Sequence, residues 1–477
     1  MTARLLLAAA TAVLCSLVFS PAAVAADRGA AGIWQGKLSV QGGIALRLVV
    51  HIAKQGDTLT GTMDSPDQSA TGIPIGKIVF EKSKLSMELP AIAGTFEGTM
   101  NEACTEIAGT WKQGVTELPL TLTRSDKALD TSRPQDPVKP YPYDEEEVTY
   151  ANPKATGVTL AGTLTLPRGD GPYAAALLIT GSGPQNRNEE LLGHRPFLVL
   201  ADYLTRRGIA VLRVDDRGIA KSTGIFAAAT SADFATDVEA GVDFLKKHKK
   251  IDPARIGLIG HSEGGLIAPM VAARSSDIAF IVLMAGPGVN GEQILYEQGR
   301  LIVSAAGAPE AAIAAQRQQQ EQMFDIIKKE PDAAEAEKRL TELAKKAYAN
   351  LPEDQKKAAG NEASVTAQFR QVNSPWFRYF LTFEPKTVLK QVKCPVLAIN
   401  GEHDLQVPPK QNLPAIEAAL KEGGNKDVTI KELPKLNHLF QTSTTGAPSE
   451  YSGISETISP IALKTMGDWI MAHTARK

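Results

Sequence analysis

The sequence has few cysteines, no cluster of charges of one sign and few long apolar runs. Its 477 residues include only three cysteines, and 51 basic against 53 acidic side chains give a formal net charge of −2. Because the charges are scattered, neither a nucleic acid nor an anionic membrane surface is expected as a partner. Cys15 lies near the N-terminus, and Cys104 and Cys394 fall in different expected domains. We therefore expect two separate buried thiols and no cysteine metal site.

One apolar run stands out near the N-terminus, from Leu5 to Phe19, after Arg4 and before the small residues of SPAAVAADRG. A charged start, an apolar stretch and a small-residue cleavage site are typical of a secretory signal peptide. The run is shorter than the roughly 20 residues that a membrane-spanning helix needs. We expect a signal peptide over residues 1–25, no membrane span, and export to the periplasm or out of the cell.

The rest of the chain divides into three expected parts. Residues 27–124 hold short apolar stretches rich in β-branched residues, separated by polar turns, which predicts a small all-β domain, an antiparallel barrel or sandwich. Four prolines within residues 125–147 predict a stiff, extended linker. From residue 148 to 477, apolar strand-like runs alternate with amphipathic helical stretches, which predicts an α/β domain with a mostly parallel sheet.

Within the α/β part, strands are expected at 175–180, 209–213, 256–260, 279–284 and 396–400, and helices at 197–207, 232–247 and 265–274. Residues from about 291 to 389 break the alternation, because they show helical periodicity without strands. We expect this segment to be a helical cap, inserted between two strands and placed over the carboxyl ends of the sheet.

The stretch LIGHSEGGLIAP carries the main candidate for chemistry. An apolar strand-like run ends at Ser262, and an apolar helical pattern begins directly after it. A tight strand-to-helix turn exposes a serine oxygen in a strained backbone, and side chains two residues before and after it would collide. Gly260 and Gly264 stand at these two positions, so Ser262 is the predicted nucleophile.

A nucleophilic serine needs a base and a carboxylate that orients the base. His438, in PKLNHLFQ, follows the last strand-like run and is the predicted base, whereas His261 is expected to pack into the sheet. Asp404 lies just past the carboxyl end of an earlier strand and is the predicted carboxylate, with Glu402 as the rival. The order Ser262, Asp404, His438 is that of α/β-hydrolases.

The anionic intermediate of acyl transfer needs two N–H donors. One is expected from Glu263, the residue after the nucleophile, whose side chain is interpreted as a favourable anion in the first helical turn. The other is expected from the loop TGSGPQNRNE, with Ser182 as the first choice and Gly183 as the alternate. This loop lacks the lysine and the glycine spacing of a phosphate-binding loop, which disfavours that reading.

Two further clusters have structural and functional interpretations. Asp215, Asp216 and Arg217 could suggest a metal or acid–base site, but a buried ion pair that braces the loops is the favoured reading. In the expected cap, Trp376 and Phe377 could line an acyl pocket, although aromatic residues at mixed spacing more often form core.

Together these motifs resemble bacterial α/β-hydrolases of the serine aminopeptidase-like (S33-type) group, and especially carboxylesterases with GSGPQ-R-E, DDRG-STG, GHSEGG and SPWFR-like segments. Here these segments are Gly181–Glu189, Asp215–Gly224, Gly260–Gly265 and Ser374–Arg378. The resemblance implies an α/β-hydrolase fold and a metal-free esterase without a cofactor, using the three residues above. One departure is Ala220, which replaces a glycine of the family pattern and is expected to adjust the loop modestly.

We therefore expect an exported carboxylesterase that cleaves a small ester with a short acyl chain through an acyl-enzyme. One alternative is a peptidase or other amide hydrolase, because esters and amides pass through the same kind of tetrahedral intermediate. Another is a protein that works mainly as a binding module through its β-domain. The sequence leaves the oligomeric state open.

Overall fold

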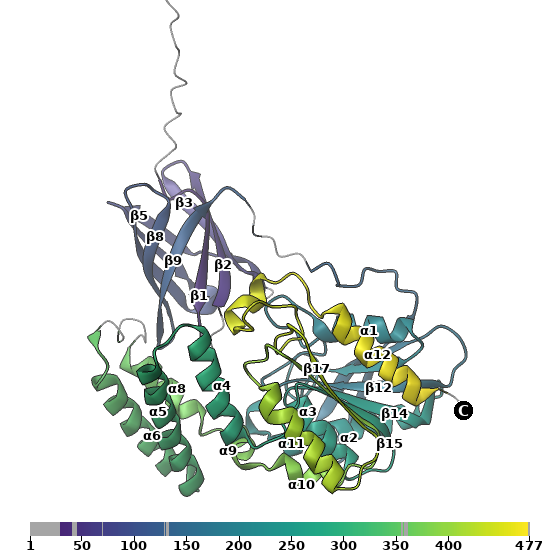
Figure 1. Ribbon diagram of the computed structural model, residues 1–477. Coiled ribbons are helices and arrows are strands. Elements are labelled where there is room, and N and C mark those ends of the chain that lie inside the picture. Colours follow the sequence, from purple (N-terminus) through teal and green to yellow (C-terminus); the bar gives the residue numbers. More distant parts are fainter. Residues whose placement is uncertain are drawn as a thin grey trace, which may run out of the picture.

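The computed structural model describes residues 29–475, except 41–44, 69, 128, 130–132, 354–355 and 357–360. It contains an N-terminal antiparallel sheet, a second sheet flanked by helices and a group of helices that lies beside both (Figure 1). The signal peptide expected over residues 1–25 lies outside the described residues. No helix in the described ranges is long and apolar enough to cross a membrane.

The N-terminal sheet is a half-barrel of nine antiparallel strands in the order β4-β3-β2-β1-β9-β8-β7-β6-β5. Its strands are β1 (Gly32–Ser39), β2 (Ala45–Gln55), β3 (Thr58–Ser65), β4 (Ala70–Pro74), β5 (Lys77–Glu81), β6 (Lys84–Leu89), β7 (Gly94–Met100), β8 (Glu106–Gln113) and β9 (Thr116–Ser125). Alternate residues face inward, as in β6, where Leu85, Met87 and Leu89 are buried. The inner face forms a core around Trp34, Phe96 and other apolar residues. This confirms the predicted all-β domain.

The second sheet has eight strands in the order β10-β11-β13-β12-β14-β15-β16-β17. They are β10 (Asp144–Ala151), β11 (Thr159–Leu166), β12 (Tyr173–Ile179), β13 (Ala210–Val214), β14 (Ile251–His261), β15 (Ile278–Met284), β16 (Val396–Gly401) and β17 (Val428–Leu433). β11 runs antiparallel to both neighbours, and β12 to β17 are parallel. This sheet and its flanking helices confirm the predicted α/β-hydrolase fold.

Helices cover both faces of this sheet (Figure 1). One face carries α1 (Pro196–Arg206) and α12 (Pro460–Thr474). The other carries α2 (Ser231–Lys247), α3 (Gly264–Ala272), α10 (Pro385–Leu389) and α11 (Pro409–Glu422). The central strands are buried on both faces, and all six residues of β16 are buried, which explains their continuous apolar sequences.

The expected cap appears as helices between β15 and β16: α4 (Gly291–Ala305), α5 (Glu310–Lys329), α6 (Ala333–Ala349), α8 (Glu362–Gln371) and α9 (Pro375–Thr382). They share a core of their own around Phe324, Leu340 and Phe369. The cap also contacts the half-barrel, because Ser364 Oγ donates a hydrogen bond to the Val115 carbonyl at 2.7 Å. The N-terminal domain therefore stands over the cap as well as over the α/β domain (Figure 1).

The described part of the segment expected to be a stiff spacer is instead docked on the α/β domain. Arg133 Nη2 donates to the Leu192 carbonyl at 2.9 Å, and Gln135 Nε2 donates to the Ile458 carbonyl at 2.6 Å. The α/β sheet also begins earlier than expected, because Asp144 already pairs with Leu166 in the β10–β11 ladder. The acidic residues that made this stretch look like linker are the solvent-facing start of a strand.

Candidate active site

Ser262 lies at the corner between β14 and α3, and its backbone is left-handed, with φ of 52°. Its N–H donates to the Met284 carbonyl on β15 at 2.8 Å, which ties the corner to the sheet. A Cβ on Gly260 would lie 2.0 Å from the Gly264 carbonyl oxygen, and one on Gly264 would lie 2.2 Å from the Ile179 carbonyl oxygen. Both glycines are therefore required for the close approach of helix and strand, as the sequence predicted.

Asp404 and His438 meet at the same edge of the sheet. Asp404 follows β16 and His438 follows β17, and the His438 Nδ1 to Asp404 Oδ2 distance is 2.8 Å. The other carboxylate oxygen, Oδ1, accepts the N–H groups of Gln406 and Val407 at 2.8 and 2.9 Å. Asp404 is 1% exposed and His438 5% exposed. The structure thus pairs His438 with Asp404, whereas Glu402 accepts a hydrogen bond from the Lys435 N–H.

Ser262 and His438 line one pocket of about 220 Å³ together with the loop at Gly181 and Ser182. Within the described residues, Ser262 Oγ forms no hydrogen bond to the His438 imidazole. Such bonds are often long in enzymes without substrate and tighten when substrate binds. The predicted nucleophile and base thus line the same pocket.

The expected oxyanion donors lie beside Ser262. Glu263 directly follows the nucleophile, and a Cβ on Gly181 would lie 3.3 Å from Ser262 Cβ, so the loop passes close to the serine. Ser182 lines the Ser262 pocket, whereas Gly183, with φ of 94°, lines the neighbouring cavity. This placement favours Ser182 over Gly183, and both assignments stay predictions.

His261 does more than pack into the sheet, which corrects its interpretation from the sequence. Its Nδ1 lies 2.9 Å from Glu189 Oε1, and its Nε2 lies 3.0 Å from the carbonyl oxygen of His438. The same Glu189 oxygen accepts the Gly181 N–H at 2.7 Å. Burial acts to lower the pKa of His261, but the Glu189 carboxylate outweighs it and raises that pKa. Glu189 and His261 therefore link the oxyanion loop to the loop of the base.

The Glu263 side chain, expected to be a favourable anion in the first helical turn, also makes specific contacts. It is 4% exposed, and its Oε1 accepts hydrogen bonds from Ser231 Oγ at 2.6 Å and from Trp376 Nε1 at 2.7 Å. Burial raises the pKa of this carboxyl, although both hydrogen bonds act in the opposite direction. Glu263 thus connects the nucleophile turn to cap helix α9.

The residues that line the Ser262 pocket do not include Trp376 or Phe377, the two possible pocket residues. Trp376 is directed to Glu263 and stacks on Phe380 with ring centroids 5.2 Å apart. Phe377 packs against Phe324 in the core of the cap. Both rings are engaged in packing, which is the alternative that the mixed spacing of the aromatic residues favoured.

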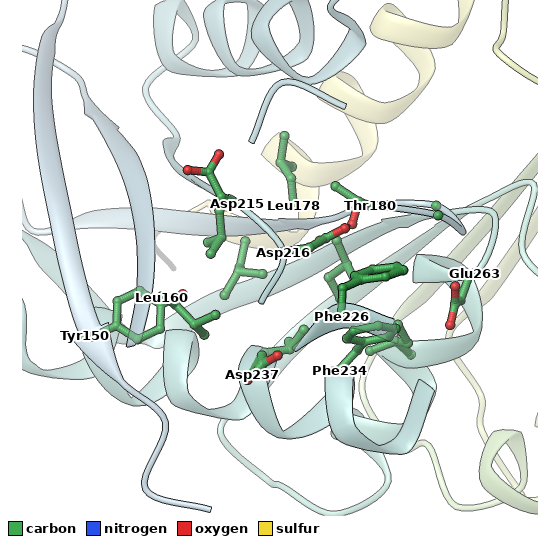
Figure 2. Close-up of a pocket in the computed structure, with 17 residues that line it drawn as sticks. Tyr150, Leu160, Leu178, Thr180, Asp215, Asp216, Phe226, Phe234, Asp237 and Glu263 are labelled. Atoms are coloured by element: carbon green, nitrogen blue, oxygen red, sulfur yellow. The ribbon is translucent and has the colours of Figure 1, made fainter. Parts of the chain in front are cut away.

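A second cavity, of about 50 Å³, is lined by Gly181 and Gly183 of the oxyanion loop and by the residues shown in Figure 2. Asp216 reaches into this region, where its carboxylate accepts hydrogen bonds from Thr180 Oγ1 and from the Gln185 N–H, both at 2.8 Å. Burial raises the pKa of Asp216 to about 7. Figure 2 shows Asp216 beside Thr180, above the stacked rings of Phe226 and Phe234.

The acidic residues next to this cavity form the bracing ion pairs that were favoured, but with partners outside their own cluster. Asp215 pairs with Arg187 at 2.8 Å, and Arg217 pairs with Asp237 at 2.6 Å. In the same loop, Ala220 has φ of 45°, a left-handed conformation that explains a glycine in the family pattern.

No group of three or more histidine, cysteine or acidic side chains in the described ranges is arranged to hold a metal ion. Cys104 Sγ donates to the Glu102 carbonyl at 3.8 Å, and Cys104 and Cys394 are each half-buried rather than buried. The described site therefore consists of the serine corner, the Asp404–His438 pair and the oxyanion loop.

The chain is similar to several known proteins. Esterase EstD from Thermotoga maritima is 26% identical over 306 residues, which are 64% of this chain and 62% of the relative. The chain thus spans less than two thirds of that relative's length. Among solved structures, the esterase Pf2001 from Pyrococcus furiosus is 16% identical with a TM-score of 0.40, covering 70% of this chain and 94% of its own. Est1E from Butyrivibrio proteoclasticus is 16% identical with a TM-score of 0.40, covering 69% and 100%.

The family comparison covers most of the α/β part. The family model described as X-Pro dipeptidyl-peptidase (S15 family) matches residues 134–432, more than half of the chain, with both Ser262 and Asp404 inside the match. The matching family is thus S15, whereas the motifs resembled S33-type hydrolases. Together with the fold and the serine corner, this match shows that the chain belongs to the X-Pro dipeptidyl-peptidase (S15) family.

Proposed function

We propose that the chain is a serine hydrolase that cleaves carboxylic esters through an acyl-enzyme. The observation that carries this proposal is the 2.8 Å contact of Asp404 with His438, in the pocket that also holds Ser262 on its strained corner. The similarity to an esterase from Thermotoga maritima supports the ester as substrate.

In the first half of the reaction, Ser262 Oγ attacks the ester carbonyl carbon while His438 Nε2 takes the hydroxyl proton. The carbonyl oxygen becomes an oxyanion, for which the N–H groups of Glu263 and Ser182 are the proposed donors. The buried Asp404 carboxylate stabilises the imidazolium and holds its Nδ1–H in place. The imidazolium then protonates the leaving alkoxide oxygen, and the C–O bond of the ester breaks.

In the second half, a water molecule takes the place of the alcohol and His438 removes its proton. The hydroxide attacks the acyl carbon, and Ser262 Oγ leaves with the proton that the imidazole returns. Each half of the reaction begins with His438 as the neutral base. The pocket volume of about 220 Å³ supports a substrate with a short acyl group.

The direct test is Ser262→Ala. We expect the rate of nitrophenyl butyrate hydrolysis to fall by about 10⁴-fold or more, because the nucleophile is lost. The matched control is Ser276→Ala, since Ser276 lies on the surface and its change should leave the rate as in the wild type. Retention of turnover by the Ser262→Ala protein would contradict the proposal.

An amide substrate is the second candidate, and the name of the family favours it, since S15 is described as an X-Pro dipeptidyl-peptidase family. Ester and amide hydrolysis can use the same serine, base and oxyanion donors. An X-Pro nitroanilide assayed beside nitrophenyl esters decides between them, by the ratio of the two kcat/KM values. Export through the leader expected at residues 1–25 is a further proposal, which N-terminal sequencing of the mature chain would decide.

A further inference from the structure

The half-barrel has a cavity of about 510 Å³ at one end, and this volume is large enough for a small organic group. Its described lining is mostly apolar, and none of the described residues that line it is charged. Two polar groups in the lining are already engaged, since Ser65 Oγ donates to Gln68 Oε1 at 2.8 Å and Gln113 Nε2 donates to the Ile92 carbonyl at 2.8 Å. The cavity therefore suits an uncharged apolar group.

The cavity lies at the end of the half-barrel that faces the other domains. Thr116 lines it, and the adjacent Val115 carbonyl accepts the hydrogen bond from Ser364 of the cap. Gln68 lines it as well, and nearby Pro66 approaches the α/β domain, since a Cβ on Gly193 would lie 3.3 Å from the Pro66 carbonyl oxygen. A group in this cavity would thus point toward the α/β domain.

Leu46 connects this cavity to the Ser262 pocket. It lines the cavity of the half-barrel and also packs against the cluster of Leu192, Leu439 and Tyr451 in the α/β domain. Leu439 and Tyr451 in turn line the Ser262 pocket. Leu46 is only partly buried, and its packing on Leu439 and Tyr451 joins apolar side chains of the two cavity linings.

The chemistry of the proposed reaction indicates which part of the ester lies on this surface. His438 must deliver its proton to the leaving alcohol oxygen, so the alcohol part has to lie on the side of His438. Leu439 directly follows His438 and belongs to the connecting cluster. The apolar surface therefore begins where the alcohol part of the ester leaves the reacting centre.

We propose that the cavity of the N-terminal half-barrel binds an apolar alkyl group on the alcohol side of the ester substrate. This inference rests on the proposed ester hydrolysis and deepens it. The N-terminal domain then determines specificity for the leaving group, while the acyl group stays in the small Ser262 pocket. Each methylene that enters an apolar site adds a substantial factor to kcat/KM.

The test fills the cavity with a large side chain. Ala70→Trp introduces an indole from β4, and Thr116→Trp introduces one from the start of β9. In each variant we expect the ratio of kcat/KM for octyl acetate to that for ethyl acetate to fall by about tenfold or more. The ratio for nitrophenyl octanoate against nitrophenyl acetate, which varies the acyl side, should change by less than about twofold.

The matched control is Ala53→Trp, because Ala53 is exposed at the far end of β2; it should keep the alkyl preference of the wild type. An unchanged octyl-to-ethyl ratio in both folded variants would overturn the proposal, and so would a loss confined to the acyl series. If the wild type hydrolyses neither ester, the proposed function fails. Calorimetry of octanol binding to the Ser262→Ala protein, with and without Ala70→Trp, then still decides whether the cavity binds an alkyl group.

Discussion

Glu189 connects two loops of the candidate site, apart from the proposed reacting residues Ser262, Asp404 and His438. One carboxylate oxygen holds both the Gly181 N–H of the oxyanion loop and the His261 ring, and the other ring nitrogen of His261 holds the backbone of His438. Glu189 touches no reacting atom, so it is a positioning residue. It fixes the distance between the loop that binds the oxyanion and the loop that carries the base.

We expect Glu189→Gln to keep the shape of this connection and to remove its charge. The carboxylate raises the pKa of His261, so this pKa should fall in the variant, as NMR titration of the histidine rings would show. The kcat for an ester should fall by about tenfold, because the loop at Gly181 and the loop of His438 lose the charged group that connects them. Glu190→Gln on the same loop is the control, and an unchanged His261 titration would contradict the assignment.

The contrast between these residues and the predicted ones shows what sequence reasoning could reach. Ser262, Asp404 and His438 were predictable because a strand-to-helix corner and strand ends at one sheet edge restrict which side chains can meet. Glu189 and His261 lie 72 residues apart and each sits within a motif, but nothing local shows that the two side chains share a hydrogen bond. Their pairing depends on how the oxyanion loop folds back over β14.

At the level of elements, the junction of β14 and α3 is the most constrained part of the fold. The carbonyl of Gly264 lies so close to Gly260 that any Cβ would meet it at 2.0 Å. The Gly264 carbonyl oxygen is a backbone atom, so it cannot move away from such a Cβ without separating the helix from the strand. The strain at Ser262 is therefore held in place by close packing on both sides.

Gly260→Ala should accordingly lower the free energy of unfolding by about 3 kcal/mol and abolish activity, because the added methyl displaces the corner. Gly453→Ala is a suitable control, since a Cβ there meets nothing within 4 Å and Gly453 lacks a left-handed φ. Urea unfolding of the two variants measures the difference. Equal stability of the two proteins would show that the corner can relax.

Element positions were predicted well where apolar runs are continuous, as in the buried strands of the α/β sheet. The predicted strand at 279–284 corresponds to β15, and the predicted helix at 232–247 corresponds to α2, each shifted by one residue at its start. The prediction was wrong where polar residues form regular structure, as at Asp144 in β10. Charged strands at a sheet edge resemble linkers, because their partners are not visible in the local sequence.

On the scale of the whole molecule, His194 lies where the loop before α1 meets the C-terminal loop. Gln441 Nε2 donates to His194 Nε2 at 3.0 Å, and His194 Nδ1 lies 3.0 Å from Thr457 Oγ1. The same His194 Nε2 also lies 3.2 Å from the Tyr451 carbonyl oxygen. Burial, together with the nearby Arg133, lowers the pKa of His194 to about 4.

Stability should therefore depend on pH through His194. In the unfolded chain a histidine takes up a proton near pH 6.5, whereas in the folded protein His194 resists it down to about pH 4. The stability that this residue contributes is complete above pH 6.5 and decreases as the pH falls toward 4, by about 3 kcal/mol. His194→Asn should flatten this part of the curve in urea unfolding, and an unchanged slope would contradict the assignment.

The hydrogen bond from Ser364 to Val115 completes a closed series of contacts among the α/β domain, the cap and the half-barrel. Both ends of the cap continue into strands of the α/β domain. The half-barrel contacts the cap through this hydrogen bond, and Leu46 of the half-barrel contacts Leu439 and Tyr451 of the α/β domain. Because each part contacts the other two, none of the three can move outward without breaking at least one of these contacts. Release of an alcohol product with a long alkyl group into solvent would then require a concerted motion of all three parts.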